Sequence, residues 1–203
     1  MRTIRTKVYK FNELNEEAKK HAINKNRTID AEGLEYLYDE AHDSVKKFHD
    51  IFGTKEGSRS WLDVNTGQID DNILEMSGIR LYKYIWNNFK NYLLSGEYYS
   101  TNGYLETQNK YHYKSRKSKI NLTHDCELTG VCWDESLLKP IYDFLEWGKD
   151  YSNTDFDTLI SDCFHELKKA LDAEEEYRKS DEFIAQELED TECEFTKDGN
   201  LFG

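Results

Sequence analysis

Residues 30–53 read DAEGLEYLYDEAHDSVKKFHDIFG and show the clearest helical periodicity in the first half of the chain. Apolar side chains recur there every three or four residues and so share one side of a helix: Leu34, Leu37, Tyr38, Ala41, Val45, Phe48 and Phe52. Gly53 follows, as is typical of a helix that ends in the left-handed conformation. The stretch predicts a helix lying on a hydrophobic core. His42 and His49 share one face of it, each followed by an aspartate, and we expect both on a solvated flank.

Three further helices are predicted from the same period and from their caps. The first follows Asn15, a candidate N-cap, and ends near Asn26. Residues 78–94 restore the helical period. The next helix covers 157–177, with its buried stripe formed by Leu159, Ile160, Cys163, Leu167, Ala170, Leu171 and Tyr177.

Two capped segments complete the helical part. Asp134 is the predicted N-cap of the helix ESLLKPIYDFLEW, in which Pro140 should cause a kink or a late start because its ring has no N–H to donate. Ser180 is the predicted N-cap of a short helix over 181–190.

Alternating apolar and polar residues predict short strands near both ends and in the middle of the chain. The segments are 6–11, 60–69, one or two strands within 97–122, and 193–202. The fold class predicted is α+β: a single compact domain over 1–203, with several amphipathic helices and a small, mainly antiparallel sheet. A division into a near-neutral lobe 1–122 and an acidic helical lobe 123–203 is an alternative.

The composition predicts a folded chain outside the membrane. Aromatic residues make up 14% of the 203 residues, which supplies enough bulk for a core although 33% of residues are charged. We find no apolar run long enough to span a membrane and no signal-peptide pattern at the start, so we expect a cytoplasmic location in a bacterial host cell. The four cysteines should then be reduced thiols.

Metal, cofactor and catalytic signatures are weak. Cys126 and Cys132 are six apart, too far for the short hook of structural zinc, and Cys163 belongs to an apolar stripe. Patterns such as G-x-S-x-G, a phosphate-cradling glycine loop or H-E-x-x-H do not occur. We therefore expect no metal, no cofactor and no catalytic residue, and an enzymatic role is not favoured.

The acidic residues are concentrated towards the C-terminus. Residues 1–122 contain 20 Lys and Arg against 17 Asp and Glu, whereas residues 123–203 contain 7 against 23. Because the apolar stripe takes the inner side of the helices, we expect the carboxylates outside. The candidate partner-binding residues are Glu166, Asp172, Glu174, Glu175, Glu176, Asp181, Glu182, Glu187, Glu189 and Asp190.

Two interpretations of this acidic region remain open. It can be a solvated surface that keeps the protein soluble. It can also imitate the phosphate charges of nucleic acid and occupy a channel lined by lysine and arginine in a partner.

A basic strip, NKYHYKSRKSKIN, covers residues 109–121. Its cations are candidate nucleic-acid contacts: Lys110, Lys114, Arg116, Lys117 and Lys119. Strand alternation places Tyr111 and Tyr113 on one face and the flanking cations on the other, so base stacking is disfavoured. Phosphate contact and long-range balance of the acidic helices remain the alternatives.

Four segments carry a resemblance to known proteins: KVYKFNELNEEAKKHAI, RLYKYIWNNF, LTGVCWDESLLKPIYDFL and DFDTLISDCFHELKKALDAEEEYRKSDEFIAQELE. Together they resemble a family of small accessory proteins encoded by phages, prophages and plasmids, over most of residues 6–203. Members are uncharacterised or antitoxin-like, and some are anti-CRISPR proteins of type II systems. The resemblance implies a protein partner and carries no active site.

Charge and resemblance together predict an anti-defence protein that binds a type II RNA-guided DNA nuclease and inhibits it. One alternative is an inhibitor that binds or trims guide RNA through the basic strip, with His112 or His124 as acid or base. Another is an antitoxin-like protein that neutralises a basic partner. The oligomeric state is not predicted.

Overall fold

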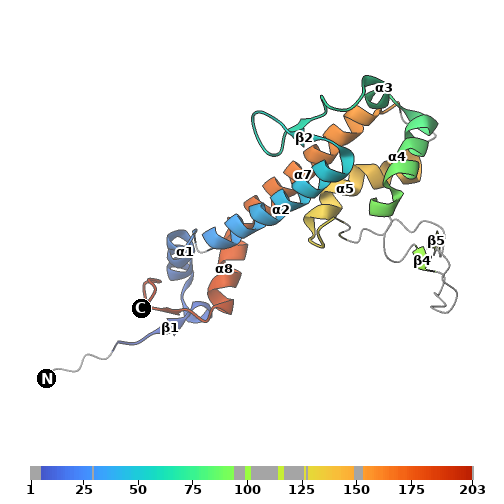
Figure 1. Ribbon diagram of the computed structural model, residues 1–203. Helices are drawn as coiled ribbons and strands as arrows, with labels where there is room; N and C mark the ends of the chain where they lie inside the picture. The colour runs from blue at the N-terminus through green and yellow to red at the C-terminus, as the bar shows by residue number, and fades with distance from the viewer. Residues whose placement is uncertain are drawn as a thin grey trace. The chain divides into compact units, whose positions relative to one another are not determined.

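The computed structural model describes residues 6–28, 30–93, 99–101, 114–116, 126, 128–148 and 153–202 (Figure 1). Helices predominate in these ranges: α1 (Glu16–Lys25), α2 (Ala31–Phe52), α3 (Asp71–Leu74), α4 (Gly78–Leu93), α5 (Trp133–Asp143), α7 (Phe156–Arg178) and α8 (Asp181–Asp190). A 3₁₀ turn, η1 (Phe11–Glu13), and a π-helical turn, η3 (Phe144–Gly148), adjoin them. Of the helices described, none combines the length and the apolar character that crossing a membrane requires.

The strands form short antiparallel pairs. The pairs are β1 (Tyr9–Lys10) with β6 (Glu194–Phe195), β2 (Lys55–Glu56) with β3 (Val64–Asn65), and β4 (Tyr99–Thr101) with β5 (Lys114–Arg116). The α+β class with amphipathic helices and antiparallel pairing is therefore confirmed.

The chain divides into two compact units, which we name by their place in the sequence. The terminal unit comprises residues 1–38 and 171–203, and the central unit comprises residues 39–170. The step in charge near residue 122 falls inside the central unit.

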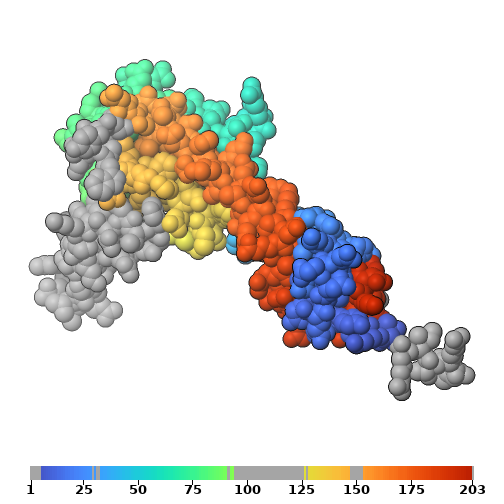
Figure 2. Space-filling view, turned by 180° about the vertical axis from the view of Figure 1, so that it is seen from behind, coloured from blue at the N-terminus to red at the C-terminus, as the bar shows by residue number. Residues whose placement is uncertain are grey.

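The two ends of the chain form the terminal unit together. Strand β1 pairs with β6 in the register Tyr9↔Phe195, and α1 packs against α8. In Figure 2 the N-terminal residues (blue) lie against the C-terminal residues (red). Its core consists of Phe11, Leu14, Ala18, Ala22, Ile23, Ile184, Leu188 and Phe195.

A glycine permits the closest approach within this unit. Gly199 has φ +78°, and a Cβ atom there would lie 2.1 Å from the carbonyl oxygen of Ala18. The C-terminal turn can therefore rest directly on the backbone of α1 only where no side chain is present.

Aromatic packing dominates the core of the central unit. The Phe48 ring lies 4.3 Å from Phe52 and 5.3 Å from Phe164 between centroids, which joins α2 to α7. Phe89 of α4 lies 4.6 Å from Phe52. Cys163 is fully buried, as its place in the apolar stripe predicts, and burial raises the pKa of its thiol.

Several predicted helix ends are confirmed. The Asn15 side chain accepts a hydrogen bond from the Ala18 N–H at 2.9 Å, and the Ser180 hydroxyl accepts one from the Phe183 N–H at 3.2 Å. Gly53 has φ +70° directly after α2. Each cap satisfies a backbone group that the helix itself leaves without a partner.

The prediction that Asp134 is an N-cap is wrong. Helix α5 begins at Trp133, with Cys132 at the cap position, and the Asp134 side chain is fully buried. Its carboxylate accepts N–H groups from Leu128, Thr129 and Gly130 at 2.9, 2.6 and 3.1 Å. Asp134 therefore holds the preceding loop, because those N–H groups lack strand or helix partners.

Pro140 does not delay the start of its helix, which is one of the two effects predicted for it. Helix α5 begins before Pro140 and continues past it to Asp143, where the chain changes to the π-helical turn η3. The start is therefore not delayed, although the proline still removes one backbone donor from the helix interior.

Two predictions of exposure are corrected. His49 is buried at 9% exposure instead of lying on a solvated flank, because it stacks on Phe164 and shares a hydrogen bond with Thr54 at 2.8 Å. Tyr177 is 49% exposed instead of buried, although its ring contacts that of Phe183 of α8 edge-on.

Candidate partner-binding surface

The structure places most of the predicted acidic residues on the C-terminal end of α7 and on α8, in the terminal unit. Glu166 is the exception: it belongs to the central unit, is half-buried and pairs with Lys169 at 3.5 Å. The other nine residues follow from Asp172 to Asp190. Some of these carboxylates have partners within the unit, and others form no ion pair with any residue that the structure describes.

Three of these carboxylates form internal ion pairs. Glu174 pairs with Arg178 at 2.8 Å. Glu175 pairs with Lys179 and accepts the Tyr38 hydroxyl at 2.5 Å. That hydrogen bond, with the nearby charge and partial burial, raises the pKa of Tyr38 to about 12.

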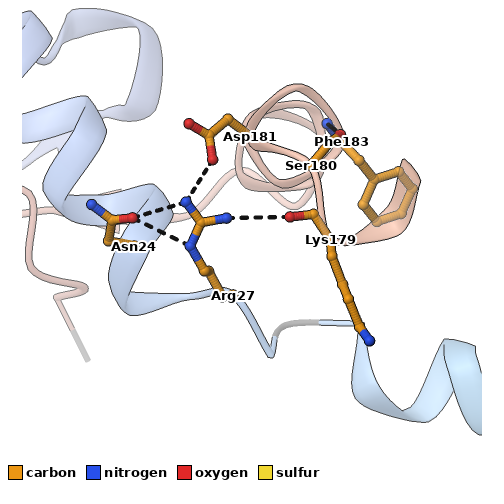
Figure 3. Close-up of polar contacts among 6 residues, drawn as sticks. All are labelled: Asn24, Arg27, Lys179, Ser180, Asp181 and Phe183. Atoms are coloured by element: carbon orange, nitrogen blue, oxygen red, sulfur yellow. Dashed lines mark hydrogen bonds and ion pairs between the residues drawn. The ribbon is translucent and has the colours of Figure 1, made fainter. Parts of the chain in front are cut away.

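The third pair, Arg27–Asp181, belongs to a larger contact at the junction of α7 and α8 (Figure 3). The Arg27 guanidinium donates to the Asp181 carboxylate at 2.6 Å and to the Lys179 carbonyl at 3.2 Å. It also donates to the Asn24 side chain at 3.3 and 2.9 Å. Arg27 therefore ties the end of α1 to the turn between the two acidic helices.

Arg178 makes a second tie to the N-terminal segment. Besides Glu174, its guanidinium pairs with Asp30 at 2.6 Å, and these side chains are more than half-buried. A planar guanidinium suits two carboxylates at once. The acidity of α7 is thus partly neutralised inside the terminal unit.

Four exposed carboxylates remain without an ion pair among the described residues, and we call them the unpaired carboxylates. They are Asp172, Glu176, Glu182 and Glu189. Asp172 and Glu176 are four apart on α7 and lie on one side of it, as Glu182 and Glu189, seven apart, do on α8. Of the other two, Glu187 is half-buried, and Asp190 accepts a hydrogen bond from Gln186 at 3.0 Å.

The basic strip is described only in part. Lys114 and Arg116 lie in β5, where they pair with Thr101 and Tyr99 of β4. Lys110, Lys117 and Lys119 lie outside the described residues, as do Tyr111 and Tyr113 of the strip and the two histidines, His112 and His124, of the RNA-trimming alternative. Nucleic-acid contact by the strip stays a prediction.

The ion pairs Glu174–Arg178 and Glu175–Lys179 join residues four apart, a spacing that the sequence shows directly, whereas the two ties to the N-terminal segment have no local signal. Arg27 and Asp181 are 154 positions apart, and Asp30 and Arg178 are 148 apart. Helical periodicity reports only neighbours within a few residues, so these ties appear only when the chain ends meet. Within the described ranges, no three His, Cys, Asp or Glu side chains converge as metal ligands.

Comparison with known proteins adds no relative: no family model, curated protein or solved structure matches this chain. The resemblance to accessory proteins of phages, prophages and plasmids stays a prediction from the sequence.

Proposed function

We propose that this protein is a binding inhibitor whose unpaired carboxylates engage a cationic, nucleic-acid-binding channel of a partner protein. Following the sequence resemblance, the most concrete partner is the RNA-guided DNA nuclease of type II systems. Such a nuclease holds its heteroduplex in a positively charged channel through the nucleic-acid backbone. A carboxylate array that enters the channel competes with that backbone.

The observation that carries the proposal is the division of the carboxylates into paired and unpaired groups. Glu174, Glu175 and Asp181 are held by arginine, lysine and tyrosine within the terminal unit. The unpaired carboxylates therefore stand on helices whose junction is tied in place. Side chains on a fixed scaffold lose less conformational entropy on binding than side chains on a loose segment.

Electrostatics supports a cationic partner specifically. The protein carries a formal net charge of −13, which attracts a positive surface at long range and repels nucleic acid. Unpaired surface carboxylates add little to folding stability in water. Their favourable electrostatic free energy becomes larger when a partner supplies the opposite charge.

The test is direct binding and inhibition with purified components. The protein is mixed at low salt with the nuclease loaded with guide RNA, and binding is followed by interferometry while DNA cleavage is followed on gels. We expect a complex and a loss of cleavage that grows with the protein concentration. A nuclease that neither binds the protein nor slows in its presence would refute this choice of partner.

A further inference from the structure

The central unit contains a polar pocket that the proposed function does not use. It lies between the hairpin residues 57–66 and one side of α7, and its volume is about 720 Å³. The hairpin contributes Ser58, Arg59 and Asp63, and α7 contributes Ser161, His165 and Lys168. Pockets of roughly 300–1,000 Å³ are typical of small-molecule sites.

Two cations in the lining of this pocket form no ion pair within the part of the chain that the structure describes. Arg59 and Lys168 are exposed, and neither forms an ion pair with any residue that the structure describes. Asp63, the one carboxylate in the lining, pairs with neither of them. His165 adds a ring nitrogen, and Ser58 and Ser161 add hydroxyl groups. In a chain of net charge −13, this lining is suited to an anion.

The hairpin wall is held in shape by contacts on both sides of the pocket. The Gly57 N–H donates to the Asp63 carbonyl at 2.6 Å, and a Cβ atom on Gly57 would come within 2.5 Å of the Asp63 side chain. The Thr66 hydroxyl donates to Asp157 of α7 at 2.7 Å. At the start of the hairpin, His42 and Glu56 are 3.1 Å apart. Because these contacts lie within the protein itself, little ordering of the hairpin is needed on binding.

The lining also has an apolar part. Leu62 and Val64 come from the hairpin, and Phe164, nearly buried, forms part of the α7 side. The Phe164 ring stacks on His49 at 5.4 Å, which fixes its position. A ligand with both an anionic group and an apolar or aromatic body can therefore use the whole pocket.

We propose that this pocket binds a small phosphorylated molecule of mononucleotide size. A guanidinium and an ammonium group with neighbouring hydroxyl groups form charge-assisted hydrogen bonds to phosphate oxygens, and arginine does so through two parallel N–H groups. A monocarboxylate would leave part of this donor set without acceptors. The lining of this pocket includes none of the unpaired carboxylates. Ligand binding here therefore does not depend on whether the proposed inhibition is correct.

The experiment is calorimetric titration of the 203-residue protein with AMP, with adenosine as the matched probe that lacks the phosphate. We expect AMP to bind and adenosine to bind at least about tenfold more weakly, because charge-assisted hydrogen bonds to the phosphate are lost. Arg59→Glu combined with Lys168→Glu should weaken AMP binding about tenfold or more. Since both side chains are exposed, the circular dichroism spectrum should not change.

The matched control is Lys47→Glu combined with Lys83→Glu, which makes the same change in net charge at two exposed lysines of the central unit outside the pocket lining. It should bind AMP as the unmodified protein does. Equal weakening in both variants would reduce the effect to general charge and overturn the site. Absence of AMP binding, or binding of only a 5′-phosphorylated oligonucleotide, would overturn the choice of a small ligand.

Discussion

Gly199 is a position where one added methyl group should disturb the terminal unit. It combines φ +78° with a Cβ position 2.1 Å from the Ala18 carbonyl oxygen. Gly53 has a similar φ of +70° but open space around it. We expect Gly199→Ala to lower the free energy of unfolding by about 3 kcal/mol and Gly53→Ala by about 1 kcal/mol, measured in urea. Equal losses would show that the close approach carries no cost.

Asp134 should matter to stability although its position in sequence suggests an ordinary helix cap. Three backbone N–H groups and the Thr129 hydroxyl converge on its buried carboxylate. Asp134→Asn removes the charge and places an amide against those donors, so we expect a loss of about 3 kcal/mol in denaturant unfolding. The control Asp143→Asn breaks only an exposed pair with Lys139 and should change stability by less than about 0.5 kcal/mol. An Asp134→Asn variant as stable as the unmodified protein would contradict this role.

His49 should make folding stability depend on pH. Burial lowers its pKa, outweighing the opposite influence of Glu56 and Asp50, while His42 adds to the lowering. Its Nε2 has no hydrogen-bond partner among the residues that the structure describes. The unfolded chain takes up the proton on this histidine near pH 6.5, and the folded chain only at lower pH. Protonation of His49 therefore costs no stability above about pH 6.5, and the free energy of unfolding falls as the pH decreases below that value.

The measurement is the free energy of unfolding between pH 7.5 and 5 for the unmodified protein and for His49→Phe, whose ring can keep the stacking on Phe164. The slope with pH should be shallower in the variant. An unchanged slope in His49→Phe would show that another group is responsible.

At the scale of elements, Arg27 joins α1 to the junction of α7 and α8 through Asp181, Lys179 and Asn24. We expect Arg27→Ala to cost about 1 kcal/mol, a modest loss because these contacts are largely exposed. Amide hydrogen exchange at the start of α8 should become faster. Lys20→Ala, at an exposed lysine of α1 with no ion pair among the described residues, should leave both measurements unchanged. Similar effects of the two changes would show that Arg27 does not stabilise the junction of α1 with α7 and α8.

The helices were the most predictable elements. Periodicity and caps locate α1, α2, α4, α7 and α8 to within a few residues, because helix signals lie within one or two turns. The partner of β1 could not be predicted, since β6 lies at the other end of the chain and each strand has only two residues. The buried role of Asp134 was missed for a different reason: its donors are only four to six residues away, but they converge on it through an irregular loop that no helix or strand period describes.

The composition of the candidate site and its ion pairs between residues four apart could be predicted from the sequence, but its contacts across the chain could not. The sequence indicates where the carboxylates lie, and solvent exposure of Glu176 and Glu182 agrees with the outward side of the apolar period. It does not indicate that Asp181 is held by Arg27, because that contact spans the chain. The pocket of the central unit was missed because Arg59 and Lys168 show no motif.

At the scale of the whole molecule, the net charge of −13 should govern association with a cationic partner. Added salt screens interactions beyond roughly 8 Å at physiological ionic strength. We expect the association rate with the nuclease to fall severalfold between 50 and 300 mM salt while the dissociation rate changes less, as followed by interferometry. Association that does not depend on salt would argue against electrostatic attraction.

The most direct test of the central proposal is the dissociation constant of the nuclease complex for two charge-reversed variants. Glu176→Lys with Glu182→Lys alters the unpaired carboxylates. Asp39→Lys with Glu75→Lys makes the same change in net charge at two exposed acids of the central unit that form no ion pair in the described ranges. We predict that the first variant binds at least about tenfold more weakly and that the second stays within about twofold of the unmodified protein. Equal weakening by both variants, or none by the first, would contradict binding through the unpaired carboxylates.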